Sequence, residues 1–480
     1  MRWAAVAALV VAGCDGATYL PRDALLDPET CRTCHAAYVR DWSGSMHAYA
    51  AEDPVFLAMN ARGQRETNGA LGDFCVGCHA PMAVREGATR DGLNLADVPR
   101  KLKGVTCYFC HTVERVDGAH NNALTLASDG VLRASFSDPV PSRAHAAGYS
   151  PLLDRERLES SSLCGACHDL VTPAGATLER TFAEWQASVF NLAPGGRTCG
   201  QCHMSQAPAP MPIAEADGVF ARRAHSHQFP GVDLALGPFP EADAQRRQVQ
   251  QLLDTTLQSA VCVAQVGGGF KVRVILDNVA AGHGWPSGAA QDRRAWVELA
   301  AYSGDQLLYR SGAVPDGTAV TAVTGDPDLW LLRDCMSDAA GRSVGMFWQA
   351  ATTEGNELPG QATFDRLDPR FYQTHILRPF PVDGAPVPGA PDRVTVRVRL
   401  QPIGLDVLAD LVASGDLDAS VAAAMPTFDV ASTPPLTWSP AAAAADTYVE
   451  GGVVFSCVSD TSLSGQGGTF PATKNRTCAP

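Results

Sequence analysis

The chain has 480 residues, of which 46% are hydrophobic and 18% are charged. This balance is typical of a globular protein of two or three domains and excludes a disordered chain. The 37 basic and 51 acidic residues give a net charge of −14, which argues against nucleic acid as a partner. An apolar run worth considering as a membrane segment occurs at the extreme N-terminus alone, so a polytopic membrane protein is excluded as well.

The first residues predict an export signal. Arg2 is followed by an apolar run over residues 3–11, which is much shorter than the roughly 20 residues of a membrane-spanning helix. The run ends in Val-Ala-Gly-Cys14, which resembles the lipobox of bacterial lipoproteins. We expect a signal peptide at 1–13, a lipid on Cys14, a tether at 14–30, and a mature protein anchored on the periplasmic side of the inner or outer membrane. The alternative is a plain secretory signal with an incidental cysteine.

The most informative residues are the 15 cysteines. Ten of them form five Cys-x-x-Cys pairs, and each pair is followed directly by a histidine. Two thiols at this spacing reach the two vinyl groups of one haem, and the adjacent histidine binds its iron. Zinc knuckles do not need a histidine after every pair, so the pattern predicts five covalent c-type haems. The predicted attachment residues are Cys31, Cys34, Cys75, Cys78, Cys107, Cys110, Cys164, Cys167, Cys199 and Cys202, and the predicted proximal ligands are His35, His79, His111, His168 and His203.

Five haem sites between residues 31 and 203 leave too little chain for a core made of protein alone. We therefore expect the haems themselves to form the core of a pentahaem domain at 31–236. Short helices and loops should wrap around the stacked haems, with little regular secondary structure.

Seven histidines lie outside the motifs, and five irons accept up to five sixth ligands. His47 lies in a predicted helix after the first motif, where Ser43 and Gly44 leave room on its face for a flat ring. His120 follows the third motif in a Gly-Ala-His-Asn loop, and His145 completes the count. These three histidines are predicted distal ligands.

Two further distal ligands are expected from later segments. One of His225 and His227 should reach iron, and His227 is favoured because a Phe-Pro-Gly turn follows it. His283 lies between two glycines, which allow the backbone to approach a macrocycle closely. A turn histidine between two strands is the alternative for His283, and His375 is predicted to be structural because it lies in a strand-like stretch. Mostly bis-histidine, low-spin irons follow from this set.

The motifs and their flanks resemble the multihaem cytochrome c-554 family over residues 28–232. The resemblance lies in CRTCHAAYVRDWSGSMHAYA, FCVGCHAPM and GVTCYFCH, and it continues in LCGACHD, TFAEWQAS and CGQCHM. It implies an electron carrier with haems stacked in close pairs and with His47 and His120 as distal ligands. Independently of the family, Thr181 and Glu184 at three-residue spacing predict a capping box that opens a helix.

The C-terminal half predicts a different architecture. Residues 237–261 are expected to contain a connecting helix, with its helical pattern over 241–260. After it, the pattern has a period of two: Val272, Val274 and Leu276 alternate with Lys271, Arg273 and Ile275, and apolar residues alternate with polar ones over 394–400. Strands are also expected at 296–302 and 306–309. The predicted fold class is therefore multidomain α+β, with an antiparallel β-sandwich domain at 262–480 behind the haem domain.

Four cysteines remain after the motif cysteines and Cys14 are removed. In an exported protein an even remainder predicts up to two disulfides. Cys457 and Cys478 are the expected pair because they are close in the sequence, and Cys262 with Cys335 follows by elimination.

These features favour an electron-transfer protein whose partners are redox proteins, such as other cytochromes or a quinol-linked donor, and whose membrane contact is the lipid on Cys14. The alternative is an oxidoreductase that acts on small nitrogen or sulfur oxides at one open haem iron, which needs a missing sixth ligand. A third reading treats the β-sandwich as an adhesion or scaffold module with the haems as cargo.

Overall fold

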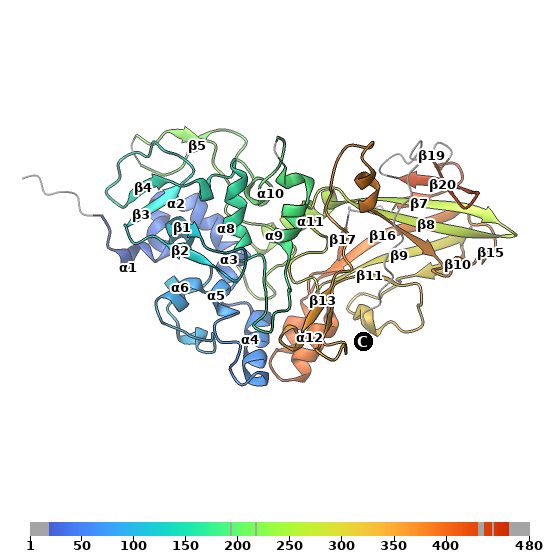
Figure 1. Cartoon of the computed structure of the whole chain (residues 1–480), viewed down its shortest axis with the longest axis horizontal. Helices are drawn as coiled ribbons and strands as arrows, with labels where there is room; N and C mark the ends of the chain where they lie inside the picture. The colour runs from blue at the N-terminus through green and yellow to red at the C-terminus, as the bar shows by residue number, and fades with distance from the viewer. Residues whose placement is uncertain (1–18, 193, 217, 431–435, 444–445, 460–480) are drawn as a thin grey trace, which may run out of the picture.

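The computed structural model describes residues 19–192, 194–216, 218–430, 436–443 and 446–459. Two regions lie end to end: an N-terminal region of short helices and loops, and a C-terminal region of long strands (Figure 1). This confirms the predicted α+β fold class. The expected signal peptide and Cys14 lie outside the described residues, and within them no helix is both long and apolar enough to cross a membrane.

The N-terminal region has little regular structure, as expected from the density of motifs. Its helices are α1 (Arg22–Leu25), α2 (Pro28–Ser43), α3 (Met46–Tyr49), α4 (Pro54–Glu66), α5 (Val76–His79), α6 (Pro81–Arg85), α7 (Cys107–Thr112), α8 (Ser161–Gly165), α9 (Thr181–Ala187) and α10 (Cys199–His203), with the 3₁₀ turns η1 (Leu95–Asp97), η2 (Arg100–Leu102), η3 (Pro151–Leu153), η4 (Leu158–Ser160) and η5 (Val189–Asn191). Its strands form three two-stranded ribbons, β1 (Val113–Val116) with β2 (Leu124–Leu126), β3 (Val131–Ala134) with β4 (Ala146–Tyr149), and β5 (Met211–Pro212) with β6 (Ala221–Arg222).

Local capping explains where several of these helices begin. The side chain of Asp27 accepts a hydrogen bond from the backbone N–H of Glu29 and is followed by proline at the first position of α2. Thr198 caps α10 and forms a capping box with Gln201. The predicted capping box of α9 is wrong, although the helix begins at Thr181 as expected. The side chains of Thr181 and Glu184 bond to a loop of the C-terminal region instead.

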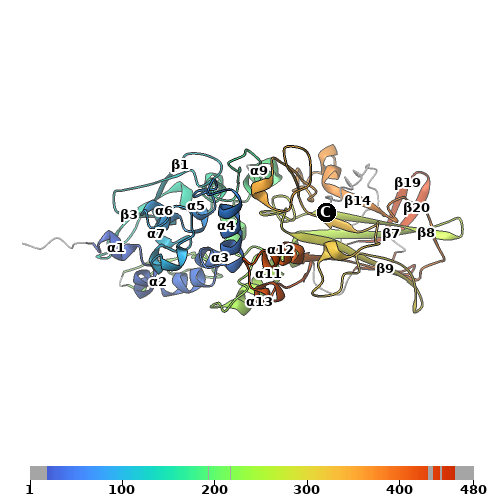
Figure 2. The same ribbon diagram turned by 90° about the horizontal axis from the view of Figure 1, so that it is seen from below.

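One longer helix joins the two regions (Figure 2). It is α11 (Ala242–Thr256), and it buries Val249 and Leu253 in the large hydrophobic core of the C-terminal region. The predicted helix over 241–260 ends too late, because β7 (Leu257–Val266) follows without a break and pairs with β8 (Gly269–Asn278) along its whole length.

Two six-stranded antiparallel sheets form the C-terminal region, which confirms the predicted sandwich. The first contains β10 (Gln306–Ser311), β9 (Arg294–Ser303), β16 (Arg393–Gln401) and β17 (Phe428–Val430), with β11 (Trp330–Leu332) on β9 and β18 (Leu436–Trp438) on β16. The second contains β14 (His375–Phe380), β8, β7, β20 (Val453–Ser459) and β19 (Asp446–Glu450), with β15 (Val387–Pro388) on β8. The remaining elements are β12 (Cys335–Ser337), β13 (Thr352–Glu354), α12 (Leu405–Ala413), α13 (Ala419–Ala423), η6 (Val320–Ala322), η7 (Phe347–Gln349) and η8 (Pro369–Thr374).

The core of the sandwich follows the predicted alternation. Val272, Val274 and Leu276 of β8 are fully buried in one apolar cluster with Val396 and Leu400 of β16. These side chains lie on the inner faces of the two sheets, where burial of a side chain of this size contributes roughly 1.5–3 kcal/mol.

The disulfide differs from both predicted pairs. Cys262 of β7 is bonded to Cys457 of β20, 195 residues away in the sequence. The two strands are antiparallel neighbours, and their register places these two cysteines directly opposite each other. Pairing by closeness in the sequence was therefore wrong, because sheet register and not loop length brings the sulfurs together. Cys335 is disulfide-bonded as well, and Cys478 lies outside the described residues.

The two regions are docked through charged and apolar contacts between α4 and the segment formed by α12 and the turn after it. Arg65 makes two hydrogen bonds to Asp416, and Arg62 bonds to Asp410 at 2.8 Å. Beneath these pairs, Val55 of α4 packs in one cluster with Leu408 of α12. Apolar packing beneath the ion pairs fixes α4 against the sandwich.

A buried acid–imidazole pair joins the neighbouring strands β8 and β14 on the outer face of the second sheet. The Nδ1–H of His375 donates to the carbonyl oxygen of Phe371 at 2.8 Å, so its Nε2 faces Asp277 Oδ2 at 3.2 Å with a lone pair. A proton must lie between Nε2 and the carboxyl oxygen, because a bare carboxylate would repel that lone pair. Burial raises the pKa of Asp277 to about 7 and lowers that of His375. The prediction that His375 is structural agrees with this placement.

We predict that Asp277→Asn gains stability relative to the wild type as the pH rises from 5 to 8. An acid whose pKa is raised by folding stabilises the fold below its unfolded pKa, and this contribution is lost as the pH rises through the folded value. The amide of the variant stays neutral and still donates to Nε2, so the difference in unfolding free energy should shift by up to about 3 kcal/mol. Urea denaturation at both pH values measures it, and a constant difference would refute the shared proton.

Candidate functional site

All five Cys-x-x-Cys-His motifs lie on or at the end of a helix in the N-terminal region. The first lies within α2 and the others on α5, α7, α8 and α10. One helical turn brings both sulfurs of a motif and its histidine to neighbouring positions. None of the ten motif cysteines is in a disulfide. Ten free thiols beside five imidazoles are the groups that covalent attachment of haem requires.

The motifs lie close to one another at their cysteines. Cys31 in the first motif and Cys107 in the third are near enough for each thiol to shift the pKa of the other. Cys164 and Cys199 affect each other in the same way, and Cys78 raises the pKa of Cys167, so the fourth motif is close to both the second and the fifth. Cys110 of the third motif lies close enough to Cys167 of the fourth to affect its pKa electrostatically. The five motifs therefore form one continuous cluster.

Four motif histidines face a second imidazole at nearly constant spacing. Two imidazoles on opposite sides of one metal ion have ring centres about 6.4 Å apart, from two metal–nitrogen bonds of about 2.0 Å and two ring radii of about 1.2 Å. The four ring pairs, with their centre-to-centre distances, are His35 with His145 at 6.4 Å, His168 with His47 at 6.2 Å, His111 with His227 at 6.4 Å and His203 with His283 at 6.5 Å. This spacing fits an iron between each pair.

Hydrogen bonds fix which ring nitrogen is free. In six of the eight paired histidines, and in His79 of the second motif, Nδ1–H donates to a backbone carbonyl oxygen, which leaves Nε2 as the lone-pair nitrogen that binds metal. The bonds run from His35 to Ile213, His79 to Ala50, His111 to Arg133, His145 to Ala146, His203 to Pro230, His227 to His225 and His283 to Gly284, at 2.5–3.2 Å. Several of the carbonyl acceptors are far from the motifs in the sequence, and no sequence pattern predicted them.

Burial keeps these imidazoles neutral. It lowers the pKa of His47 and His227 to about 3 and that of His283 to about 4. A neutral imidazole is the form that binds a metal ion, because the protonated ring has no lone pair to offer.

His79 of the second motif is different from the other four. Its ring lies face to face with Phe56 of α4, with centres 3.9 Å apart and planes within 5°. Among the described residues, no second histidine ring is paired with His79 at the spacing found for the other motifs. The residue types here fit one axial ligand for iron and not two.

His120 is not where the sequence prediction placed it. Its side chain is exposed to solvent. The neighbouring Asn121 and Asn122 have positive φ, and their backbone N–H groups bond to Asp169 and Ala166 beside the fourth motif. These bonds hold the turn against the motif and leave His120 on the surface, so the expectation of a distal ligand at this position is corrected.

The structure also separates the two histidines near residue 226. His227 lies opposite His111 and against Tyr38, whereas the backbone oxygen of His225 serves as the acceptor for the ring of His227. Sequence reasoning missed Phe56 and the identity of each histidine's partner. Within the described residues no group of three His, Cys, Asp or Glu side chains converges to hold a metal ion by itself.

Comparisons with known proteins agree with this site. Residues 30–112 match the family model described as cytochrome c554 and c-prime. The chain is similar in structure to a penta-haem cytochrome c552 from Thermochromatium tepidum, with a TM-score of 0.54 and 19% identity over 84% of this chain and 96% of that chain. No curated protein matches the chain.

Ten free thiols, paired imidazoles and this fold define a multihaem c-type cytochrome, a haem electron-transfer protein. The resemblance seen in the sequence is confirmed over residues 30–112, which are similar to the cytochrome c554 and c-prime family.

Proposed function

We propose that this chain is an exported electron-transfer protein that carries five c-type haems, four of them bis-histidine and one with an open iron position. The proximal ligands are His35, His79, His111, His168 and His203, and the distal ligands are His145, His227, His47 and His283 for the first, third, fourth and fifth motifs. The observation that carries the proposal is the constant 6.2–6.5 Å spacing of four imidazole pairs.

Haem bound at these sites supplies one-electron redox chemistry. The residues of the chain determine what that chemistry is used for. An iron held by both imidazoles of a pair would have no position left for a substrate, and the Nδ1 hydrogen bonds hold each ring in one orientation. The motif cysteines lie close together, so all five sites form one cluster. Closely spaced sites favour electron transfer from one to the next and do not require a substrate.

Mass spectrometry of the holoprotein after acid–acetone extraction should find five haems that stay bound. Thioether bonds survive this extraction, whereas haem held by ligation alone is removed. A Cys75→Ser/Cys78→Ser double variant is expected to lose one haem equivalent. Retention of fewer than five haems by the wild type would contradict the proposed number.

The oxidised holoprotein should contain four low-spin haems and one high-spin haem by electron paramagnetic resonance. We expect His145→Gly to raise the high-spin content to two haems, because it removes one imidazole of a pair. His120→Gly is the matched control and should leave the spectrum unchanged, since its side chain is exposed. An additional high-spin signal in the control, or none in His145→Gly, would overturn these ligand assignments.

A second candidate function rests on His79. An iron with one axial ligand can bind a small molecule, so reduction or oxidation of small nitrogen or sulfur oxides at the second motif is the alternative to pure electron transfer. Carbon monoxide added to the reduced protein is the test. Binding of one equivalent of carbon monoxide supports the open position at the second motif. If no carbon monoxide binds, the open position is refuted and electron transfer is the remaining function.

The proposed location is the outer side of the cytoplasmic membrane, with a lipid on Cys14 as the anchor and redox proteins as partners. The lipobox-like residues before Cys14 support it. Cys14→Ser is expected to move the protein from the membrane fraction to the soluble periplasmic fraction, because serine cannot take the thioether-linked lipid. A variant that stays with the membrane would refute the anchor, and immunoblots of both fractions measure it.

A further inference from the structure

The backbone of the loop that carries His283 packs closely against neighbouring side chains. It connects β8 to β9, and Gly282 has a φ of +78°, which favours glycine. A Cβ atom on Gly284 would lie 2.9 Å from Glu184 Oε2 and 2.8 Å from the carboxyl carbon of Glu357. Glycine at 284 is therefore required by the two carboxyl groups that press against this position from outside the loop.

Glu184 reaches the loop from α9 and holds it by two hydrogen bonds. Its Oε2 accepts from the backbone N–H of Gly284 at 2.9 Å and from the hydroxyl of Ser287 at 2.7 Å. Thr181, one turn earlier, lies 2.8 Å from the same hydroxyl and accepts from the N–H of Gly288 at 3.1 Å. These are the side chains that would otherwise cap α9, whose N-terminus has no side-chain cap.

The neighbouring Glu357 does not disturb the hydrogen bonds from Glu184 to the loop. Its carboxyl group and that of Glu184 lie within about 6 Å of each other, so two negative charges there would repel. Burial raises the pKa of Glu357 to about 9, which keeps it neutral at neutral pH. Glu184 is thus free to act as the acceptor for the loop.

The same helix is tied to the fourth and fifth motifs. The N–H of Phe182 donates to the carbonyl of His168 at 3.1 Å, and the indole N–H of Trp185 donates to Arg197 at 2.9 Å, just before the fifth motif. Phe182 also packs on Gly165 of the fourth motif, where a Cβ would lie 2.3 Å from its ring. Any shift of α9 relative to these motifs is blocked at three points.

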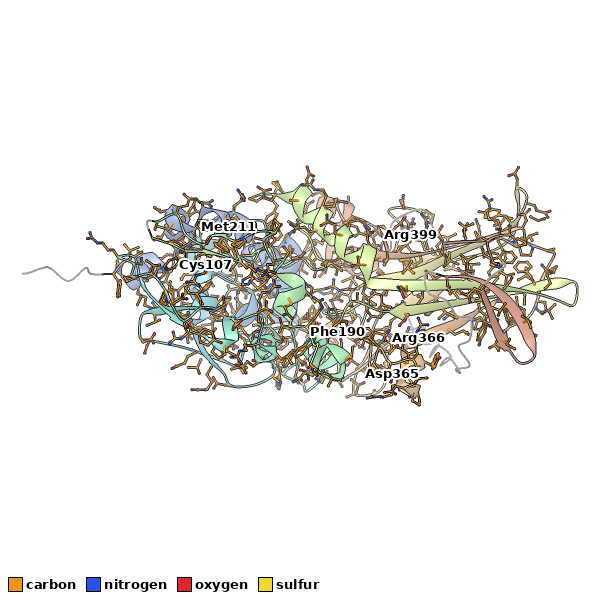
Figure 3. All side chains as sticks on the ribbon, turned by 90° about the horizontal axis from the view of Figure 1, so that it is seen from above. Cys107, Phe190, Met211, Asp365, Arg366 and Arg399 are labelled. Atoms are coloured by element: carbon orange, nitrogen blue, oxygen red, sulfur yellow. A yellow bond between two sulfur atoms is a disulfide. The ribbon has the colours of Figure 1, made fainter. Side chains whose placement is uncertain are left out.

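The sandwich holds the other side of the loop. Asn278 of β8 donates to the carbonyl of His283 at 2.6 Å, and Arg293 donates to the carbonyl of Ser287 at 2.7 Å. Arg293 also pairs with Asp233, which precedes α11. Figure 3 shows Phe190, which follows α9, at this junction between the two regions, and Gly282 lies against its ring.

We propose that Glu184 and Thr181 are positioning residues that set His283 of the sandwich opposite His203 of the fifth motif. The inference rests on the proposed function, in which His283 and His203 bind the same iron. In this proposal α9 is fixed against the fourth and fifth motifs, and its two side chains hold the loop of the sandwich so that His283 faces His203.

The test compares five variants of the full-length holoprotein by electron paramagnetic resonance. His283→Gly defines the signal of a lost ligand. Glu184→Ala and Thr181→Val should convert part or all of one low-spin haem to the high-spin form seen in His283→Gly, and free imidazole should restore the low-spin signal. Glu184→Gln retains an amide oxygen that accepts both bonds, so it should keep the wild-type spectrum. Gln186→Ala, exposed on the same helix, is the matched control and should also match the wild type.

The outcomes separate the two claims. If His283→Gly alters one haem while Glu184→Ala and Thr181→Val, with full haem content, match the wild type, the positioning role is refuted and the ligand stands. If His283→Gly leaves the spectrum unchanged, the proposed ligand itself fails and the positioning role falls with it. If Glu184→Ala does not fold, the comparison rests on Thr181→Val, which removes one hydroxyl and preserves the shape of the side chain.

Discussion

The spacing of paired imidazoles is the constraint on which the N-terminal region depends. An iron between two rings tolerates little variation in distance, and the four pairs differ by only a few tenths of an ångström. Each pair joins segments that are distant in the sequence, such as His47 and His168. The chain between them is free to be loop, short helix or ribbon as long as the rings arrive in place. This explains why the region has short elements and many backbone carbonyls aimed at imidazoles.

Much of the fold could be predicted from the sequence because local patterns encode it. The period-two alternation over 272–276 and 394–400 marks strands β8 and β16, and the five motifs mark the haem segment. Boundaries were harder to predict, since α11 passes directly into β7 and no glycine or proline marks the change. The disulfide between Cys262 and Cys457 could not be predicted, because it depends on which strands become neighbours.

The candidate site was predictable in composition but not in pairing. The motif residues can be recognised by their spacing, whereas the sequence around a lone histidine does not indicate which motif histidine it will face. His120 illustrates the limit: its distance from the third motif suited a ligand, but two backbone bonds of Asn121 and Asn122 keep it at the surface. The Thr181 and Glu184 spacing predicted the right helix for the wrong reason, because tertiary contacts claimed the side chains that local capping would use.

The closeness of the motif cysteines has a consequence for how the protein is made. Cys31 lies close to Cys107, and Cys164 lies close to Cys199, so a chain that folded before haem attachment would bring these thiols together in pairs. Thiols held in such pairs are open to oxidation to a disulfide, the bond that Cys262 and Cys457 form in the sandwich. We therefore expect thioether formation on the motif cysteines to precede folding of the haem segment.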